Sequence, residues 1–279
     1  AGGDAAGWAE GVGAAARFAA PAAPVWLNDG RLLVTDAPNH AIRAIAPDGT
    51  VSTVAGLGPT KAGYLDADTK AGLLNGPTGL AIELGPTVSF FVADGANHVL
   101  RGLTLAVDGS AKLVTAAGTG QVGTNDEGDP GPATMNTPAA VAVARDGTPF
   151  VVDRAAGSLR YMRAGKLLTA KVTGVALGEP TAVAAPTVER VYVVDAKRGV
   201  VLRLKATAPL AYAAEDFGTF SQPVGLAIAP NGSLLVAERG AKRISVVDPD
   251  SGKTTHVLGG GAAPAGATQV QAAFGAPTG

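Results

Sequence analysis

The chain has 279 residues, of which 47% are hydrophobic and only 5% aromatic, so Ala, Val and Leu must form most of any core. Its 39 Gly and 19 Pro disfavour long helices and favour short strands joined by turns. The absence of Cys excludes disulfides and thiolate chemistry. A formal net charge of −1 argues against a general nucleic-acid binder, which needs a broad positive field.

Targeting and membrane signals are few. No apolar stretch approaches the ~18 residues that a membrane-spanning helix needs. The first residue is Ala1 rather than Met, so we expect a chain processed from a longer one. This favours an extracytoplasmic location, either secreted or as an ectodomain.

One pattern repeats five times along the chain, beginning each time with a proline: Pro21, Pro77, Pro138, Pro180 and Pro223. The second apolar run of each copy ends in an acidic residue: Asp36, Asp94, Asp153, Asp195 and Glu238. A basic residue follows on the third run: Arg43, Arg101, Arg160, Arg203 and Arg243. Dipeptides such as Asp29-Gly30, Asp48-Gly49, Asp108-Gly109, Asp146-Gly147 and Asn231-Gly232 supply the hairpin turns between runs. Each copy therefore predicts a meander of four short antiparallel strands.

The spacing of the copies indicates a β-propeller. The last two intervals between the acidic residues match the period of about 40 to 45 residues of four-stranded propeller blades. The first two intervals are longer because of Gly- and Asp-rich loops at 57–76 and 119–137. Continuous apolar runs such as 150–152 are typical of strands buried on both faces, as in stacked blades. The innermost strands are expected near Val25, Leu80, Val141, Val183 and Leu226.

We therefore predict one all-β propeller domain over residues 1–279, with five complete four-stranded antiparallel blades that could belong to a six-bladed ring. The blades are expected at about 21–56, 77–118, 138–174, 180–218 and 223–260. In the third copy, the fourth strand is expected at 171–174 (KVTG), and in the fourth copy it is degenerate, near 212–218. Residues 1–20 and 261–279 are interpreted as inter-blade linkers. Since both ends look like linkers, we expect the array to continue beyond at least one of them.

Two copies carry an Asn-His pair before the arginine: Asn39-His40-Ala41-Ile42-Arg43 and Asn97-His98-Val99-Leu100-Arg101. With the opening proline, the Val-x-Asp strand end and Val-Ala-Gly, this pattern resembles the NHL-repeat β-propeller family of the bacterial type. The loop at 125–134 is similar to the long inter-blade loop of these repeats. Copies 3 to 5 depart from the Asn-His pair. The resemblance implies the fold and leaves the activity open, because this fold hosts many functions.

The acidic and basic columns predict architecture rather than a site. An acid at the end of each second strand is expected to cap it by binding backbone N–H groups in an Asx-type turn. The arginines are expected to lay their stems over apolar neighbours and to keep their guanidinium groups in solvent.

Three groups of residues are candidate ligands. His40 and His98 occupy equivalent positions on adjacent copies and could hold zinc with a carboxylate, although the pair is also ordinary consensus at this turn. Asp126, Glu127 and Asp129 are oxygen donors on a Gly-containing loop that suits Ca²⁺, or else form a solvated loop. Asp66 and Asp68 could join them if the two loops meet. Asn231 is a formal glycosylation acceptor, but its Asn-Gly hairpin turn explains the residue.

Charge is unevenly distributed, since residues 151–205 hold 10 basic and 4 acidic side chains, a net charge of +6. Consecutive blades are neighbours, so we expect this basic block to form one sector. An acidic protein partner, or a second copy of this chain, would bind there through Arg160, Arg163, Lys197 and Arg198. The alternative is ordinary solvated blade edges.

The sequence contains no nucleophile motif, P-loop or dinucleotide-binding fingerprint. We therefore interpret the chain as a non-catalytic protein-binding or scaffolding module of a larger protein or assembly, with no catalytic residues and no cofactor other than the candidate Ca²⁺. The alternative is a metal-dependent lyase or hydrolase-type enzyme with its site at the propeller channel mouth, using His40, His98 or the loop carboxylates. RNA binding is disfavoured by the net charge.

Overall fold

A computed structural model describes residues 2–68, 71–83, 85, 87–106, 110–127, 132–260 and 268–270. In these residues the chain forms β-strands and three single-turn 3-10 helices, with no α-helix. None of the described helices is long and apolar enough to cross a membrane. The extracytoplasmic location stays a prediction.

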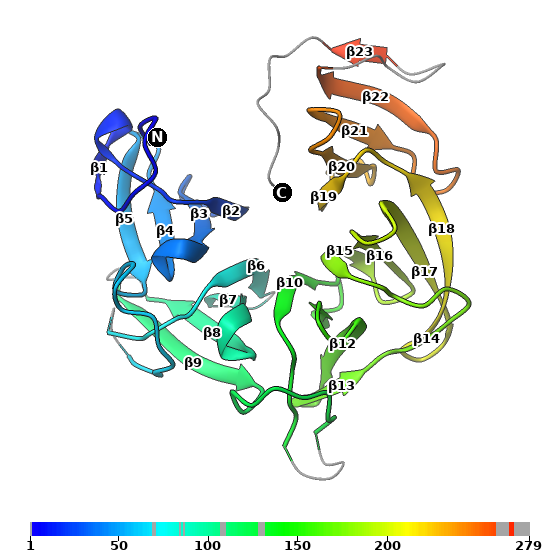
Figure 1. Ribbon diagram of the computed structural model, residues 1–279, viewed down its shortest axis with the longest axis horizontal. Coiled ribbons are helices and arrows are strands. Elements are labelled where there is room, and N and C mark those ends of the chain that lie inside the picture. The colour runs from blue at the N-terminus through cyan, green and yellow to red at the C-terminus, as the bar shows by residue number, and fades with distance from the viewer. Residues whose placement is uncertain are drawn as a thin grey trace. The chain divides into compact units, whose positions relative to one another are not determined.

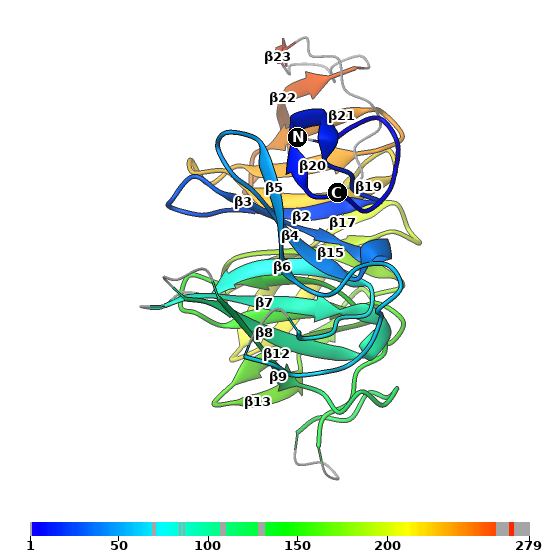
Figure 2. The same ribbon diagram turned by 90° about the vertical axis from the view of Figure 1, so that its left-hand side faces the viewer.

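Five antiparallel sheets make up the fold, and they are the blades of a β-propeller (Figure 1). Blade 1 contains β2 (Pro21–Trp26), β3 (Leu32–Asp36), β4 (Ala41–Ile45) and β5 (Thr50–Ala55). Blade 2 contains β6 (Pro77–Glu83), β7 (Val88–Asp94), β8 (Val99–Leu105) and β9 (Ala111–Ala117), which lie side by side in Figure 2. Blade 3 contains β10 (Pro138–Val143), β11 (Pro149–Asp153), β12 (Ser158–Arg163) and β13 (Lys166–Thr169).

Blade 4 contains β15 (Pro180–Thr187), β16 (Arg190–Asp195), β17 (Val200–Ala208) and β18 (Ala211–Thr219). Blade 5 contains β19 (Pro223–Ile228), β20 (Leu234–Glu238), β21 (Arg243–Val247) and β22 (Thr254–Gly259). In every blade these four strands follow one another in sequence order across the sheet, so the first of them lies at one edge. The predicted fold class is confirmed.

Three blades gain a fifth strand. β1 (Gly11–Val12) pairs antiparallel with β5, whereas β14 (Lys171–Thr173) and β23 (Thr268–Val270) pair parallel with β18 and β22. The prediction that 171–174 is the fourth strand of blade 3 is therefore wrong. Ala164 and Gly165, with φ of 49° and 74°, form a two-residue turn of the kind that closes tight hairpins. The fourth strand begins directly after them, at Lys166, and leaves 171–173 to pair with blade 4.

The hairpin turns confirm the predicted dipeptides wherever they are described. The second residue of each has a φ near +85°, at Gly30, Gly49, Gly147 and Gly232. The Asp or Asn side chain before each glycine accepts the backbone N–H two residues further on, as Asn231 Oδ1 does from Ser233 at 3.0 Å. This bond accounts for Asn231 without a glycan. Asp108-Gly109 lies outside the described residues.

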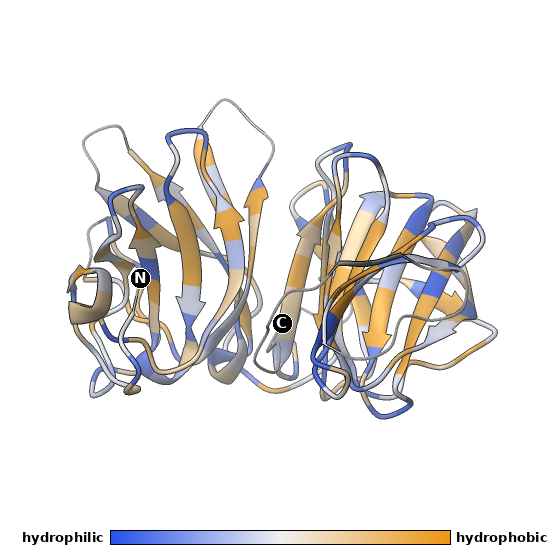
Figure 3. Ribbon diagram, turned by 90° about the horizontal axis from the view of Figure 1, so that it is seen from above, coloured by the Kyte–Doolittle hydropathy of each residue, from blue (hydrophilic) through white to orange (hydrophobic). Residues whose placement is uncertain are grey.

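The chain divides into two compact units, Ala1–Ala142 with Met162–Leu168, and Val143–Tyr161 with Thr169–Gly279. In the first unit, β2 packs against β6, and blades 1 and 2 share a core that includes Ile42, Val54, Leu80, Phe90 and Leu103. In the second, β15 packs against β19, and blades 4 and 5 share Tyr192, Val201, Phe217, Leu234 and Val236. Figure 3 shows the hydrophobic residues concentrated on the strands.

Candidate functional site

A buried carboxylate ends the second strand of each blade. All five side chains are fully excluded from solvent: Asp36, Asp94, Asp153, Asp195 and Glu238. Asp36 Oδ1 accepts the N–H groups of Ala19 and Ala20, both at 3.0 Å, just before β2 begins. The acids are thus structural, as predicted. The predicted Asx-type turn, in which the acid binds backbone N–H groups close to it in sequence, is wrong for Asp36, because Ala19 and Ala20 are far from it in sequence. The carboxylate instead ties the end of the second strand to the start of the first.

The same bond recurs in the other blades for which it is described. Asn75 N–H donates to Asp94 Oδ1 at 2.8 Å, and Ser221 N–H donates to Glu238 Oε2 at 2.8 Å. Asp195 accepts from Gly178 and Glu179 at 2.8 and 3.1 Å. A buried carboxylate is tolerated only when its oxygens have partners, and these backbone groups supply them.

A left-handed residue lies four positions after each acid, in the turn to the third strand. The five residues are His40, His98, Gly157, Gly199 and Lys242, with φ of 50°, 56°, 61°, 66° and 52°. Glycine adopts this conformation without strain, whereas His and Lys do so at a cost. The 3-10 turns η2 (Ala37–Asn39) and η3 (Gly95–Asn97) lead into the two histidines.

The arginine of the third strand is buried in three blades, contrary to the prediction that its guanidinium lies in solvent. Arg43, Arg101 and Arg160 follow their acids by seven positions and are fully buried. Their Nη1 atoms lie 3.8, 3.1 and 3.8 Å from the carboxylates of Asp36, Asp94 and Asp153. A buried guanidinium needs a counter-ion and hydrogen-bond acceptors, and the acid of the same blade is the counter-ion.

Blades 4 and 5 do not repeat this pair at the same position. Seven residues after the acid they carry Leu202 and Ser245, and Ser245 Oγ donates to Glu238 Oε1 at 2.5 Å. Arg243 reaches Glu238 from a different place on the strand, with Nε 2.7 Å from Oε1. Arg203 turns away to Glu215, with Nη2 2.7 Å from Oε1, and its guanidinium carbon lies 4.8 Å from the Phe217 ring centre.

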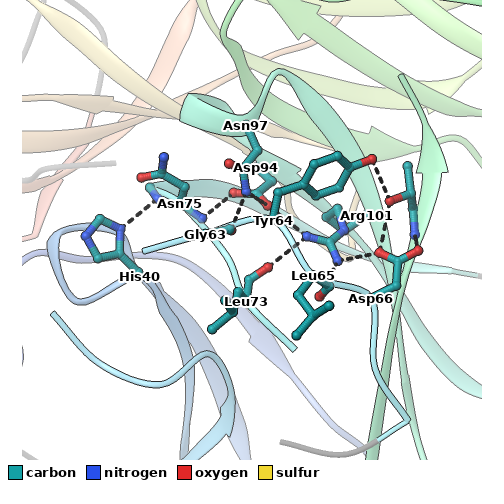
Figure 4. A network of polar contacts seen from close by, with 12 residues as sticks. His40, Gly63, Tyr64, Leu65, Asp66, Leu73, Asn75, Asp94, Asn97 and Arg101 are labelled. Atoms are coloured by element: carbon teal, nitrogen blue, oxygen red, sulfur yellow. Dashed lines mark hydrogen bonds and ion pairs between the residues drawn. The ribbon is translucent and has the colours of Figure 1, made fainter. Parts of the chain in front are cut away.

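In blade 2 the preceding linker completes the arginine site (Figure 4). Arg101 donates to the Leu73 carbonyl at 2.9 Å, to the Leu65 carbonyl at 3.1 Å and to Asp66 Oδ1 at 2.7 Å. The Tyr64 ring lies over the guanidinium, with its centre 5.2 Å from the central carbon. The linker at 57–76 is therefore fixed to its blade through one buried cation.

The amide of Asn97 joins the same network, donating to the Gly63 carbonyl at 2.7 Å and to Asp94 Oδ2 at 2.8 Å. Burial raises the pKa of Asp94, and the bonds from Asn75, Asn97 and Arg101 oppose that rise. The Asn of the Asn-His pair thus has a structural function, since it connects the acid to the linker.

Blade 1 repeats this arrangement with the N-terminal residues in the place of the linker. Arg43 donates to the carbonyls of Ala9 and Arg17 at 2.9 and 3.3 Å, and Asn39 donates to the Gly7 carbonyl at 2.8 Å. The Trp8 ring centre lies 4.3 Å from the Arg43 guanidinium carbon, where blade 2 has Tyr64. Residues 2–20 thus make on blade 1 the contacts that residues 57–76 make on blade 2.

The two histidines face the start of the next blade. The Gly76 N–H donates to His40 Nδ1 at 3.1 Å, and the Thr137 N–H donates to His98 Nδ1 at 3.2 Å. An imidazole that accepts at Nδ1 carries its proton on Nε2, so neither nitrogen offers a lone pair to a metal while this bond holds. The second ring nitrogen of His40 lies on the side away from Asn75 (Figure 4). Among the described residues, no three His or acidic side chains are grouped to hold a metal ion.

The candidate calcium residues are engaged by protein groups or lie outside the described residues. Glu127 Oε2 accepts the Ala133 N–H at 3.0 Å. In its linker, Asp126 takes the position that Glu10 and Asp66 take in theirs, three residues after Gly123, Gly7 and Gly63. Asp129 is not among the described residues. Asp66 binds Arg101, and Asp68 lies 3.0 Å from Lys112 Nζ, so these two do not join the loop carboxylates in one site.

The five first strands offer almost no ionisable groups for a site. Across β2, β6, β10, β15 and β19, all of them described, Glu83 is the single ionisable side chain. These five strands therefore offer a metal no more than one acidic or imidazole ligand. Sequence reasoning missed this feature, although the composition of the five strands shows it.

The basic block is less positive in the folded chain than its composition indicates. Arg160 is buried, so it cannot belong to an exposed partner surface. Acidic residues from outside the block pair with its side chains: Asp250 with Arg190 at 2.7 Å, Asp216 with Arg198 at 2.8 Å, and Glu215 with Arg203 and Lys205 at 2.7 and 2.9 Å. Arg163 and Lys197 remain exposed without such an ion pair in the described structure.

Comparison with known proteins supports the fold. No family model matches the sequence, and no curated protein does. Among solved structures, a gluconolactonase from Xanthomonas campestris is 16% identical, with a TM-score of 0.58 over 83% of this chain and 73% of that one. A putative gluconolactonase is 15% identical, with a TM-score of 0.62 over 84% of this chain and 76% of that one. A virginiamycin B lyase from Staphylococcus aureus is 12% identical, with a TM-score of 0.53 over 83% and 82% of the two chains.

These likenesses correct the functional interpretation made from the sequence. The chain was expected to be a non-catalytic scaffold, whereas the solved propellers that it resembles are enzymes, a lactonase and a lyase by name. At this level of identity they show the fold alone, and the fold is a β-propeller.

Proposed function

We propose that the chain is a propeller enzyme of the hydrolase or lyase type. The observation that carries the proposal is a fold shared over more than four fifths of the chain with a gluconolactonase and with a streptogramin B lyase. The absence of a nucleophile motif does not oppose it, because a hydrolase can activate water and a lyase can act through acid–base groups.

The proposed site lies at the end of the blades where the second strand turns into the third. Two partly exposed groups with acid–base chemistry occur there at equivalent turn positions of blades 1 and 2, namely His40 and His98. With Nδ1 occupied by a backbone N–H, each imidazole is neutral and presents Nε2–H as a donor. A neutral imidazole of this kind can polarise a substrate carbonyl or stabilise a leaving oxygen. We propose His40 and His98 for that role.

A bound metal, expected from the sequence for an enzyme of this type, does not fit the described residues. While Nδ1 of each histidine accepts its backbone N–H, the other ring nitrogen carries a proton and cannot bind a metal. The described residues also contain no cluster of three ligands.

We also propose that the repeat is of the NHL type. The contacts support this assignment, because each residue of the Asn-His-x-x-Arg motif has its own partner in blades 1 and 2. The asparagine binds acid and linker, the histidine binds the next blade, and the arginine binds the linker carbonyls. Blades 3 to 5 depart from the motif in sequence and lack the Asn-His contacts.

The test is turnover of a lactone, followed by acid release at constant pH, and of a streptogramin B, followed by chromatography. We expect activity that persists in EDTA. His40→Asn and His98→Asn keep an acceptor for the backbone N–H but remove the Nε2–H donor, so they should lower kcat by about 10²-fold or more if the imidazoles act on substrate. Folded protein that turns over neither substrate class would overturn the proposed activity, and full activity in the double Asn variant would overturn the assigned residues.

A further inference from the structure

Two consecutive blade junctions in the first unit are closed by the same unusual bond. At each, a left-handed histidine accepts a backbone N–H from the residue that precedes the opening proline of the next blade. Gly76 precedes Pro77 and Thr137 precedes Pro138, and their N–H groups lie 3.1 and 3.2 Å from Nδ1 of His40 and His98. No equivalent imidazole exists at the other turns, where Gly157, Gly199 and Lys242 take the position.

Both partners in these bonds are held in an uncommon backbone conformation. Gly76 and Thr137 have φ of 64° and 65°, facing histidines with φ of 50° and 56°. For a β-branched residue such as Thr137 this conformation is a genuine outlier, and it persists only where surrounding contacts determine it. The His98 bond is one such contact, so an imidazole contributes to holding the strained start of β10.

We propose that His40 and His98 form pH-sensitive hydrogen bonds that join blade 1 to blade 2 and blade 2 to the start of β10. The bond requires a lone pair on Nδ1, which a neutral imidazole has and an imidazolium lacks. Protonation places an N–H on Nδ1 directly opposite the backbone N–H, so an attraction becomes a repulsion. Imidazoles change charge between about pH 5 and 8, and both junctions loosen as the pH falls through that range.

Other charged groups near these turns do not account for such a loss. They are Asp36 and Asp94 before the turns, Arg43 and Arg101 after them, and Glu10, Lys61, Asp66, Asp126 and Glu127 on the linkers. Arginine and lysine stay charged throughout this range, and carboxylates of model peptides titrate near pH 4, below it. The raised pKa of Asp94 acts in the opposite direction, because a carboxyl with a raised folded-state pKa favours the folded state as the pH falls.

The experiment uses substitutions that separate the acceptor from its charge. Asparagine tolerates a positive φ, and its Oδ1 can take the place of Nδ1, but it does not titrate. Glycine also tolerates the conformation but has no acceptor. The control is His256→Asn, because His256 is exposed and its Nδ1 contacts Thr255 Oγ1 rather than another blade.

Two measurements at pH 5 and pH 8 in 0.15 M salt decide the question on the full chain: the urea midpoint, and amide exchange at Gly76 and Thr137 after correction for intrinsic rates. We expect the unchanged protein and His256→Asn to have a lower urea midpoint at pH 5 than at pH 8. Exchange at both amides should be at least about tenfold faster at pH 5. His40→Asn/His98→Asn should keep its pH 8 values at pH 5. His40→Gly/His98→Gly should have fast exchange at both pH values.

The proposal is overturned if the urea midpoint of the double Asn variant falls as much between pH 8 and pH 5 as that of the unchanged protein. It is also overturned if protection at Gly76 and Thr137 in the unchanged protein is equal at the two pH values. If the double Gly variant does not fold, the comparison of the double Asn variant with His256→Asn still decides. None of these outcomes depends on catalytic activity, so the proposed pH-sensitive bonds and the proposed function can fail separately.

Discussion

Arg101 donates from Nη1 to Asp94 Oδ2 at 3.1 Å in blade 2, and both side chains are fully excluded from solvent. This ion pair connects the second and third strands to each other. Nη1 and Nη2 of Arg101 also donate to the carbonyls of Leu73 and Leu65, on a linker that is more than 25 residues away in sequence. The blade and its linker are therefore stabilised by the same pair of charges.

Replacing Arg101 with Met should destabilise the protein strongly, by about 3 to 5 kcal/mol, because it leaves Asp94 buried without its cation. The linker carbonyls of Leu65 and Leu73 lose a donor at the same time. Arg31→Ala is the matched control, since Arg31 and Asp29 form a surface ion pair that contributes about 1 kcal/mol or less. Urea unfolding of both variants checks the prediction, and equal losses would contradict it.

Gly56 and Gly147 provide a second matched pair, because both have a φ near +90°. A Cβ on Gly56 would lie 2.1 Å from the His40 carbonyl oxygen, whereas a Cβ on Gly147 would meet nothing within 4 Å. Gly147→Ala should therefore lose only about 1 to 2 kcal/mol of stability, because alanine is strained in this backbone conformation. Gly56→Ala should lose a further ~1–3 kcal/mol because the turn at His40 must move. Similar unfolding midpoints for the two variants would show that this turn is not rigid.

Much of the fold could be predicted because its signals are local. An Asp-Gly turn fixes its own hairpin, so the strands on either side of Asp146-Gly147 could be placed from four residues. The Ala164-Gly165 turn was missed because alanine seldom adopts a positive φ, and the fourth strand of blade 3 was misplaced as a result.

The burial of Arg43, Arg101 and Arg160 could not be predicted, because it depends on contacts with residues that are distant in sequence. Arg43 is buried by the carbonyls of Ala9 and Arg17, and nothing near Arg43 itself shows that they are available. The role of the histidines was missed for a related reason. The sequence shows two imidazoles at equivalent positions but not which ring nitrogen is occupied, and that nitrogen decides between a metal ligand and a hydrogen-bond acceptor.

The expected acidic or identical partner stays a prediction, now limited to Arg163 and Lys197. Both are exposed, whereas Arg160 is buried and Arg198 pairs with Asp216. If a second copy binds either side chain, sedimentation in 20 mM salt should show self-association that disappears in 500 mM salt and in Arg163→Glu/Lys197→Glu, because screening removes exposed attraction. Arg31→Glu should leave it unchanged. A sedimentation profile insensitive to salt would contradict self-binding through these side chains.

Asp66 and Asp68 should differ sharply although they are two residues apart on the same linker. Asp66 accepts from buried Arg101 at 2.7 Å and from the Thr115 N–H at 2.9 Å. Asp68 pairs with Lys112 at 3.0 Å where both side chains are more than half exposed. Asp66→Ala should lose about 1.5 to 3 kcal/mol, the range for hydrogen bonds to charged groups, and Asp68→Ala less than about 0.5 kcal/mol. Equal losses in urea unfolding would mean that the linker is not fixed through Arg101.

The same reasoning predicts that Ca²⁺ does not stabilise this protein. Asp126 occupies the linker position of Glu10 and Asp66, and both of those carboxylates accept a backbone N–H from the fourth strand, Glu10 from Thr53 at 2.7 Å. A carboxylate used in this way has fewer lone pairs for a cation that needs six to eight oxygen ligands. A ligand that binds only the folded state at 100 times its Kd adds about 2.7 kcal/mol, which thermal unfolding detects easily. We expect the same Tm in 5 mM CaCl₂ and in EDTA. A Tm that rises with Ca²⁺ in the unchanged protein but not in Asp126→Asn would restore the calcium site.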